Sequence, residues 1–327
     1  MNSHPATIRL SARRQTKILT KKLWKDKILY IMFLPVLANF IIFHYLPMYG
    51  VKIAFYNYHP AYPMNMAPWV GWQKFEYFFK SYYFWDYTRN TLAISISSII
   101  VGFPLPIIMA LLINEIRKPK LKRTFQTVTY MPWFVSSVIV VGIIGMLLNP
   151  TDGIVNQIIT SLGRQPVNFM GTPGLFIPVY LGMGIWQNTG FGAIVYLAAI
   201  SGVDAELYEA AVIDGAGRFS RMWHITIKSI LPTITILFIL RLGGILNLNG
   251  MDILLLQNPM NLSASEVIQT FVYKRGIAGV SATGGGASVD YSYAAAVGLM
   301  LSVIGFLMVL LSNIIVKKLS DSEMALF

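Results

Sequence analysis

Six long apolar runs, separated by polar segments, dominate the pattern of hydrophobic and polar positions along this chain. They cover residues 28–48, 91–113, 125–148, 174–200, 229–247 and 293–316. Each run has roughly the 20 predominantly apolar residues that a helix needs to cross the hydrocarbon core of a bilayer. The pattern therefore predicts an all-α membrane protein with six transmembrane helices.

The composition agrees with a lipid environment. Hydrophobic residues make up 55% of the 327 residues and charged residues only 12%, and the mean hydropathy is +0.58. The chain has no cysteine, which excludes a disulfide framework and thiolate chemistry. Prolines at 35, 104, 106, 132, 178 and 232 fall in or near the runs, so kinked helices are expected.

The net charge of +12 comes from basic residues that cluster at the ends of the apolar runs. Eight lie in an N-terminal arm, residues 1–27. If this arm is cytoplasmic, ten more fall on its side of the membrane and seven on the other, so the positive-inside rule predicts that both termini are cytoplasmic. The arm lacks the interleaved aromatic residues of a nucleic-acid stacking surface. No nucleic-acid partner is expected.

Two segments on the predicted outer side are longer than simple turns. Residues 49–89 are rich in Trp, Tyr and Phe, which fits an aromatic belt at the membrane interface or a sugar-stacking surface, the belt being favoured. Residues 249–291 contain a predicted amphipathic helix over 263–273 and a Gly-rich tract over 283–287. The Gly243–Gly244 pair and the small residues at 294–298 predict close approach between helices.

The loop between the fourth and fifth runs carries the most informative motif. Ser201 and Asp204 have the spacing of a capping box, and Gly215 allows the left-handed conformation that ends a helix. Two alanines in the middle would make this helix thin enough to enter a partner's groove. Glu209 and Asp214 add negative charges that arginines of a partner could bind.

The motif Glu-Ala-Ala-x-x-Asp-Gly-Ala, at positions 209–216, resembles the cytoplasmic loop of binding-protein-dependent ABC importer permeases. The resemblance implies a type I importer permease (MetI-like) fold with a cytoplasmic coupling helix. It implies a permease domain over 28–327, with an importer core at about 85–320 and a coupling loop at 201–228. The implied ATPase-coupling residues are Glu209, Ala210, Ala211, Asp214, Gly215 and Ala216.

Further blocks extend the resemblance over most of the chain, and they lie at residues 44–50, 69–72, 90–91, 266–273 and 291–299. They are most similar to permeases that import oligosaccharides derived from polysaccharides, such as alginate or rhamnogalacturonan fragments. A uronic-acid-containing oligosaccharide is therefore the expected substrate.

The resemblance also implies the assembly. A second permease subunit, expected to be a different chain, would line the path together with this one in the cytoplasmic (inner) membrane. Two ATP-binding subunits would bind ATP and Mg²⁺, so no cofactor is expected in this chain. An extracytoplasmic solute-binding protein would deliver the substrate to the outer segments. The sequence does not distinguish a homodimer from a heterodimer of permeases.

Arg241 is the costliest residue to place in the predicted spans, because a mid-membrane arginine is unfavourable by about 2.5–3.5 kcal/mol on insertion scales. It is a candidate for binding a substrate carboxylate or, alternatively, for bracing the helix bundle. Aromatic and amide side chains nearby could contact sugar or make interhelical hydrogen bonds. These candidates are Trp186, Asn188, Phe191, Asn247 and Asn249.

Two other function classes find little support. The chain has no Walker motif, no His-Glu-x-x-His motif and no grouped histidines, so neither catalytic nor metal-binding residues are expected and ATP hydrolysis is assigned to another subunit. An ion-coupled secondary transporter would place carboxylates inside the spans. Here Asp and Glu fall in loops or at span ends. A permease for another small solute remains an alternative.

Overall fold

The structure is a computed structural model that describes residues 25–279 and 289–319. In this part of the chain, regular structure is helical apart from one isolated β-bridge between Tyr56 and Trp69. Most of the predicted N-terminal arm and the Gly-rich tract at 283–287 lie outside the described residues. The chain divides into two compact units, residues 1–53 and 54–327.

The first unit contains the first predicted span. It begins with α2 (Lys27–Phe40) and continues through the π-helical turn η1 (Ile41–Tyr45) into α3 (Leu46–Met48). A 3₁₀ segment, η2 (Tyr49–Phe55), extends the helical stretch to 29 residues. Apolar side chains occupy all sides of this helix, which is typical of a segment surrounded by lipid.

The second unit holds the other helices of the described residues. Its longer helices are α4 (Gln73–Phe79), α5 (Phe84–Gly102), α6 (Pro104–Asn114), α7 (Pro119–Tyr130), α8 (Ser137–Leu147), α9 (Ile154–Ser161), α10 (Phe176–Ser201), α11 (Ala205–Ile213), α14 (Leu231–Gly243), α15 (Gly250–Leu256) and α18 (Tyr291–Leu319). Its short helical segments are η3 (Met64–Met66), η4 (Met131–Phe134), η5 (Pro173–Leu175), α12 (Arg218–Arg221), η6 (Met222–Thr226), α13 (Ile227–Ser229), α16 (Leu262–Ser265), α17 (Ile268–Tyr273) and η7 (Lys274–Ala278).

Three predicted spans are single helical stretches that are long and apolar enough to cross a membrane: Lys27–Phe55, Phe84–Asn114 and Tyr291–Lys318. The other three predicted runs fall in helix pairs that meet this test only together, with bends of 99°, 74° and 62°. The described residues therefore provide up to six spans if each bent pair counts as one. The 74° bend separates α10 from α11, and the 62° bend precedes α14 near Pro232.

The predicted span over 125–148 is more sharply broken than the kink expected from Pro132, since its two helices meet at 99°. Between α7 and α8 the chain forms the 3₁₀ turn η4, and Val135 is extended, with φ −82° and ψ 130°. Pro132 has no N–H to donate and disfavours a continuous α-helix. Gln187 on α10 then donates from Nε2 to the Val135 carbonyl oxygen at 2.9 Å, which satisfies a backbone group exposed by the break.

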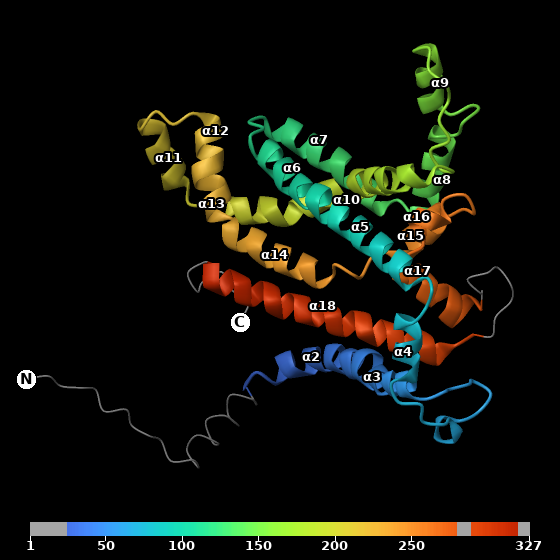
Figure 1. Cartoon of the computed structure of the whole chain (residues 1–327). Coiled ribbons are helices and arrows are strands. Elements are labelled where there is room, and N and C mark those ends of the chain that lie inside the picture. Colours follow the sequence, from blue (N-terminus) through green and yellow to red (C-terminus); the bar gives the residue numbers. More distant parts are fainter. Residues whose placement is uncertain (1–24, 280–288, 320–327) are drawn as a thin grey trace, which may run out of the picture. The chain divides into compact units, whose positions relative to one another are not determined.

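α10 forms the centre of the second unit. It contacts α5, α6, α7 and α14, and Figure 1 shows it running among these helices. One buried apolar cluster joins α6 to α10 through Leu111, Ile113, Leu197 and Ile200. A second cluster, nearer the other end of α10, includes Met183 with residues of α5, α8 and α15. These clusters fix the helices that line the cavity described below.

The crossing of α14 and α18 depends on two glycines. A Cβ on Gly243 would overlap the Val309 side chain, and a Cβ on Gly305 would lie 2.7 Å from the Gly243 carbonyl oxygen. This confirms the predicted close approach at Gly243. Gly298, predicted to serve the same purpose, has no atom within 4 Å of its Cβ position among the described residues, because it lies on another part of α18.

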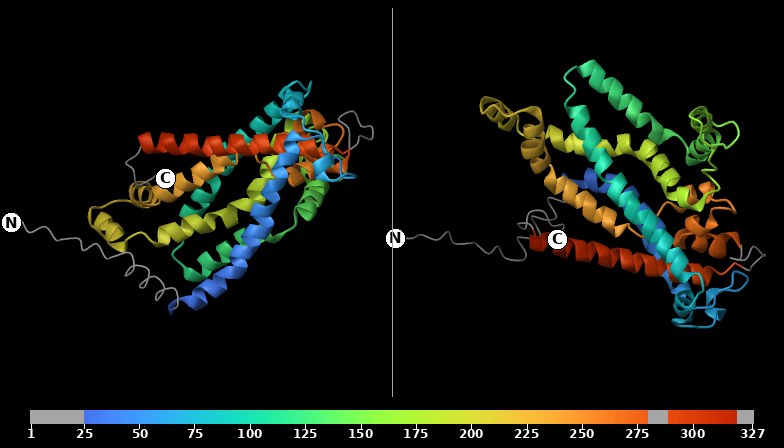
Figure 2. Two further views of the ribbon diagram at one scale, coloured as in Figure 1. Left: turned by 90° about the horizontal axis from the view of Figure 1, so that it is seen from below. Right: turned by 45° about the horizontal axis from the view of Figure 1, so that its top comes forward.

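α11 and α12 lie at one end of the second unit, whereas α9 and α15–α17 lie at the other (Figures 1 and 2). The predicted continuous helix over 263–273 is wrong, since α16 and α17 are separated at Glu266 and Val267, which are extended. Asn90 on α5 donates to the Glu266 carbonyl oxygen at 3.1 Å, and Ile268 N–H donates to Thr91 Oγ1 at 3.0 Å. Side chains of α5 thus take over backbone bonds that a continuous helix would have made.

Candidate functional site

A cavity of about 540 Å³ lies among α5, α10, α14 and α15 of the second unit. Five of the six residues predicted for the substrate path line it: Asn188, Phe191, Arg241, Asn247 and Asn249. Trp186 does not line it and is 52% exposed, because its side chain leaves α10 on another face. The fold thus brings together residues separated by up to 61 positions in the sequence, 188 to 249.

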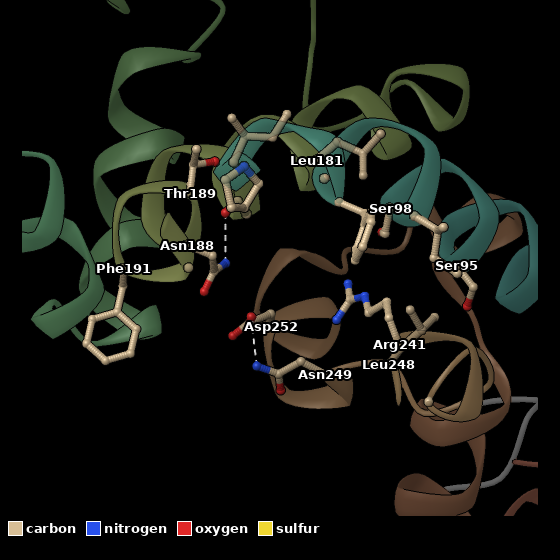
Figure 3. Close-up of a pocket in the computed structure, with 18 of the residues that line it drawn as sticks. Ser95, Ser98, Leu181, Asn188, Thr189, Phe191, Arg241, Leu248, Asn249 and Asp252 are labelled. Carbon is tan, nitrogen blue, oxygen red and sulfur yellow. Dashed lines mark hydrogen bonds between the residues drawn. The ribbon is translucent and has the colours of Figure 1, made fainter. Parts of the chain in front are cut away.

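Arg241 lies in the last turn of α14. This position is electrostatically favourable, because the carboxyl end of a helix attracts positive charge. Within the described parts of the chain, its guanidinium makes no hydrogen bond or ion pair. Figure 3 shows the guanidinium directed into the cavity. Five N–H donors are therefore available in the cavity for an acceptor that is not part of the described chain.

Asp252 is a cavity residue that the sequence analysis missed. It lies in the first turn of α15, and its Oδ2 accepts a hydrogen bond from Asn249 Nδ2 at 2.8 Å. Its Oδ1 is buried and has no hydrogen-bond partner within the described residues. The Asn-x-x-Asp spacing at the start of a helix was the available signal. Among the described residues that line the cavity, Arg241 is the one cation and Asp252 the one anion, on α14 and α15 (Figure 3).

An aromatic surface forms another part of the cavity wall. The rings of Trp133 and Phe191 are stacked, with their centroids 4.5 Å apart and their planes at 5°, and both residues line the cavity. Trp133 lies in the 3₁₀ turn between α7 and α8, so the break in this span places it there. Sequence reasoning missed Trp133 because it expected a kink at Pro132 and not a complete break of the span.

Polar side chains of α5 and α10 complete the lining. Asn188 donates from Nδ2 to the Gly184 carbonyl oxygen at 2.8 Å, which leaves its amide oxygen available. Ser95 and Ser98 are buried on α5, and Ser95 Oγ has no hydrogen-bond partner in the described structure. Such a mixture of aromatic faces, amides, hydroxyls and opposite charges suits a polar solute that also has apolar faces.

The predicted coupling helix is α11, but it begins at Ala205. Asp204 is its N-cap, since Asp204 Oδ1 accepts from Glu206 N–H at 3.0 Å. The proposed start at Ser201 is wrong, because Ser201 ends α10 and its hydroxyl donates to the Leu197 carbonyl oxygen at 2.9 Å. Ser201 therefore has the sequence spacing of a helix cap but is the last residue of α10 and caps no helix.

Gly215 ends α11 in the predicted left-handed conformation, with φ +76°. Ala216 N–H donates to the Ala211 carbonyl oxygen at 2.8 Å, and Gly215 N–H donates to that of Val212 at 3.1 Å. These two bonds form a Schellman motif. The motif gives the chain a sharp, defined turn between α11 and α12.

The other predicted coupling residues lie on α11 or in the turn directly after it. Glu209, Ala210 and Asp214 are exposed, whereas Ala211 and Ala216 are half-buried. The same part of the chain also exposes large apolar side chains that sequence reasoning did not include, namely Leu207, Val212, Ile213, Phe219 and Trp223. These residues combine charge and apolar area, as is usual for surfaces that bind another protein.

Two contacts connect this exposed segment to the bundle. Tyr208 Oη and Thr226 Oγ1 are 2.9 Å apart and share a hydrogen bond between α11 and η6. Arg218 Nε lies 4.0 Å from Glu115 Oε2, at the end of α6. These contacts join α11 to η6 and α12 to the end of α6, and the chain runs from η6 through the 62° bend into α14, which carries Arg241. In the described residues, no three His, Asp or Glu side chains gather into a metal-binding group.

A helical bundle with apolar spans, a polar cavity between them and a charged helix at one end defines a membrane protein of the solute-transporting class. Residues 102–321 match the family described as "Binding-protein-dependent transport system inner membrane component". This match covers more than half of the chain, and the chain belongs to that family. It is accordingly an ABC-type permease component of the inner membrane.

Similar proteins cover nearly the whole chain. Protein LplB of Bacillus subtilis (strain 168) is 43% identical over 294 residues, covering 90% of each chain. The polygalacturonan/rhamnogalacturonan transport system permease protein YteP of the same organism is 38% identical, covering 94% of each. Both the full-length similarity and the family match confirm the predicted fold class and family.

Solved structures give the same fold. A chain of a bacterial ABC transporter involved in the import of the acidic polysaccharide alginate is 36% identical, with a TM-score of 0.81, covering 93% of this chain and 99% of that one. The alginate transporter in complex with an alginate pentasaccharide-bound periplasmic protein matches with 36% identity and a TM-score of 0.80, covering 92% of this chain and 98% of that one.

Proposed function

We propose that this permease moves a uronic-acid-containing oligosaccharide across the cytoplasmic membrane, and that Arg241 binds a carboxylate of that substrate in the cavity. The observation that carries the proposal is the Arg241 guanidinium, which lies in the cavity without a hydrogen-bond or ion-pair partner in the described residues. The names of YteP and of the alginate transporter, both of which handle acidic polysaccharides, support the same substrate class.

The cavity chemistry fits such a substrate. A planar guanidinium can donate two parallel hydrogen bonds to a carboxylate. The stacked Trp133 and Phe191 offer an apolar surface for the less polar face of a sugar ring, and Asn188 and Asn249 offer amides for its hydroxyls. Asp252 can accept hydrogen bonds from two hydroxyl groups but repels a second carboxylate. The expected fit is therefore one uronate beside Arg241 and hydroxyl-bearing parts of the sugar beside Asp252.

One cation is also enough for transport. A hydrogen bond to a charged group contributes about 1.5–3 kcal/mol, which corresponds to roughly 10- to 150-fold in affinity. A cluster of cations would hold an anionic sugar more tightly and slow its release. The single Arg241 supplies selectivity for an acidic sugar while leaving the substrate able to dissociate.

The test is competitive uptake by the reconstituted importer of a neutral and a uronic oligosaccharide of equal length. Arg241→Gln keeps hydrogen bonding and loses charge, so we expect the uronic-to-neutral uptake ratio to fall about tenfold or more. Arg241→Lys keeps the charge but loses the planar fork, so an intermediate ratio is expected. Asp252→Asn should leave binding at Arg241 intact and improve uptake of sugars with adjacent carboxylates.

The alternative role for Arg241 is to brace the helices. In that case Arg241→Gln would lower the amount of assembled importer or its thermal midpoint, and the surviving complex would take up both sugars with the wild-type ratio. An unchanged ratio in a normally assembled variant excludes the substrate role.

The coupling segment supports a function in the assembly. We infer that α11 docks on one of two ATP-binding subunits, which hold ATP and Mg²⁺ and perform hydrolysis, and that Glu209 and Asp214 contact or position that subunit. A second, different permease would complete the path, with both termini cytoplasmic. Uptake should then require ATP and persist when an uncoupler removes the ion gradient at constant ATP. The opposite result would favour an ion-coupled carrier.

The outer segments, 49–89 and 249–291, are proposed to meet the solute-binding protein. The description of the family as part of a binding-protein-dependent transport system supports this proposal. Two ion pairs give the outer region a defined shape, Lys74–Asp290 at 2.9 Å and Lys274–Glu266 at 2.6 Å. Crosslinkers on these segments should capture the binding protein in a complex trapped with ATP. Failure there, with crosslinks elsewhere succeeding, would contradict this docking site.

A further inference from the structure

Two buried hydroxyl groups of α5 take no part in the hydrogen bonding of the described fold. Ser95 and Ser98 are 2% and 8% exposed, and neither makes a hydrogen bond with the described residues. A hydroxyl inside a helix can donate to the carbonyl oxygen four residues earlier, and Thr91 on α5 does so, to Tyr87 at 2.7 Å. Buried polar groups without a partner are rare in proteins. The two serines therefore have donors available for a partner outside the described chain.

These hydroxyls belong to the wall of the cavity that contains Arg241. The residues of α5 that line the cavity are Ser95, Ser98, Ile99 and Gly102. Their spacing of three, four and seven residues places them on one face of the helix. Ser97 lies on another face and does not line the cavity. Figure 3 shows Ser95 and Ser98 on α5 at the same cavity as the Arg241 guanidinium.

A ring contact sets the relative height of α5 and α14. Phe103, directly after α5, and Phe238 of α14 have ring centroids 5.1 Å apart. The two helices run in opposite directions (Figure 1), so Arg241 and Ser98 lie on the same side of this contact along the bundle. At a rise of 1.5 Å per residue, Arg241 is about 4.5 Å beyond it and Ser98 about 7.5 Å. Ser98 is therefore at nearly the height of Arg241, and Ser95 is about one turn farther.

A carboxylate bound by a guanidinium still has acceptor capacity. Its two oxygens offer about four lone-pair sites, and the two parallel hydrogen bonds from Arg241 occupy two of them. An acceptor left unpaired in a buried site is costly. We propose that Ser95 and Ser98 donate hydrogen bonds to the substrate carboxylate that Arg241 binds. This inference rests on the proposed function, the import of a uronic sugar, and it gives the carboxylate subsite a second wall on α5.

The neutral charge of the serines matters for selectivity. A second cation would attract any anion and hold it more tightly, whereas a hydroxyl adds a directed hydrogen bond and no net charge. Arg241 then supplies the attraction for an acidic sugar, and the α5 hydroxyls supply the orientation of its carboxylate. The rival partner for these hydroxyls is a hydroxyl group of the sugar. That role would affect acidic and neutral sugars alike, which makes the two roles separable.

The experiment is competitive uptake of a uronic and a neutral oligosaccharide of equal length by the reconstituted importer. The solute-binding protein is the same for every variant, so its own selectivity cancels when a variant's uptake ratio is divided by the wild-type ratio. Ser98→Ala should lower the uronic-to-neutral ratio about tenfold, because a hydrogen bond to a charged group is lost. Ser95→Ala should lower it less. Ser97→Ala is the matched control on the same helix and should keep the wild-type ratio.

A double variant tests whether Ser98 and Arg241 bind the same group. Arg241→Gln combined with Ser98→Ala should lower the ratio by less than the product of the two single effects, because partners of one group are coupled. A fall equal to that product would place the serine on a different group and refute the proposal. The thermal midpoint without substrate should not fall in Ser98→Ala, since no hydrogen bond of the described fold is lost.

The remaining outcomes separate this inference from the proposed function. Wild-type ratios in both serine variants, together with a lowered ratio in Arg241→Gln, would overturn the α5 subsite and leave the proposed function intact. A wild-type ratio in Arg241→Gln would refute both. Equal loss of uronic and neutral uptake in Ser98→Ala would assign its hydroxyl to a part that the two sugars share. A lowered midpoint with a wild-type ratio would show a structural role, and either result would overturn the α5 subsite.

Discussion

Replacement of Gly215 tests whether the turn after α11 couples ATP hydrolysis to transport. Gly215 has φ +76°, and no neighbouring atom of the described residues lies within 4 Å of the position that a Cβ would take. A substitution there changes backbone strain without a steric clash. The left-handed conformation costs an L-residue roughly 1–2 kcal/mol, with β-branched residues at the upper end. Gly215→Val should therefore disfavour the native turn by about 2 kcal/mol, or roughly 30-fold.

The structural result of this strain is specific. The two Schellman hydrogen bonds, from Ala216 to Ala211 and from Gly215 to Val212, would be lost in conformers that relieve it. The direction of α12 relative to α11 would then no longer be fixed. We expect Gly215→Val to retain ATP hydrolysis that no longer responds to substrate, with uptake reduced about tenfold or more, and Gly215→Ala to be intermediate.

The assay is substrate-stimulated ATPase activity and uptake by the same proteoliposomes. Gly217→Val is the matched control, because Gly217 has φ −67° and ψ 168° and also has an open Cβ position. It adds the same side chain two residues away without strain. Normal coupling in assembled Gly215→Val, or an equal defect in Gly217→Val, would refute the argument from backbone conformation.

Two further substitutions test the packing that positions the cavity. Gly305→Ala places a methyl group against the Gly243 carbonyl oxygen. The resulting overpacking, about 1–3 kcal/mol, should lower the apparent thermal midpoint of the purified importer. The control is Gly298→Ala on the same helix, where the space is open among the described residues, and it should leave the midpoint unchanged. Buried Asn261 donates to the Met170 and Leu256 carbonyl oxygens and accepts from Ser265. Asn261→Ala should cost about 3 kcal/mol or more and speed limited proteolysis of the outer region, and wild-type proteolysis rates would contradict this assignment.

The pattern of apolar runs was sufficient to predict a helical membrane protein, because the length and apolar character of each run depend only on the local sequence. The same holds for the left-handed turn at Gly215, where the missing Cβ decides the conformation. The motif at 209–216 was sufficient to predict the family, since its residues are contiguous. These features needed no knowledge of which helices are neighbours.

Only the tertiary structure decided what faces the cavity. Arg241 and Asp252 are eleven positions apart, on two helices joined by a turn that begins after Gly243, so their common cavity could not be deduced from helical periodicity. Trp133 reached the cavity because the span broke at η4, and Trp186 missed it because of its direction from α10. The break between α16 and α17 likewise depended on Asn90 and Thr91 of a distant helix. Side-chain direction and hydrogen bonds between remote segments are properties of packing, and packing is set by the whole chain at once.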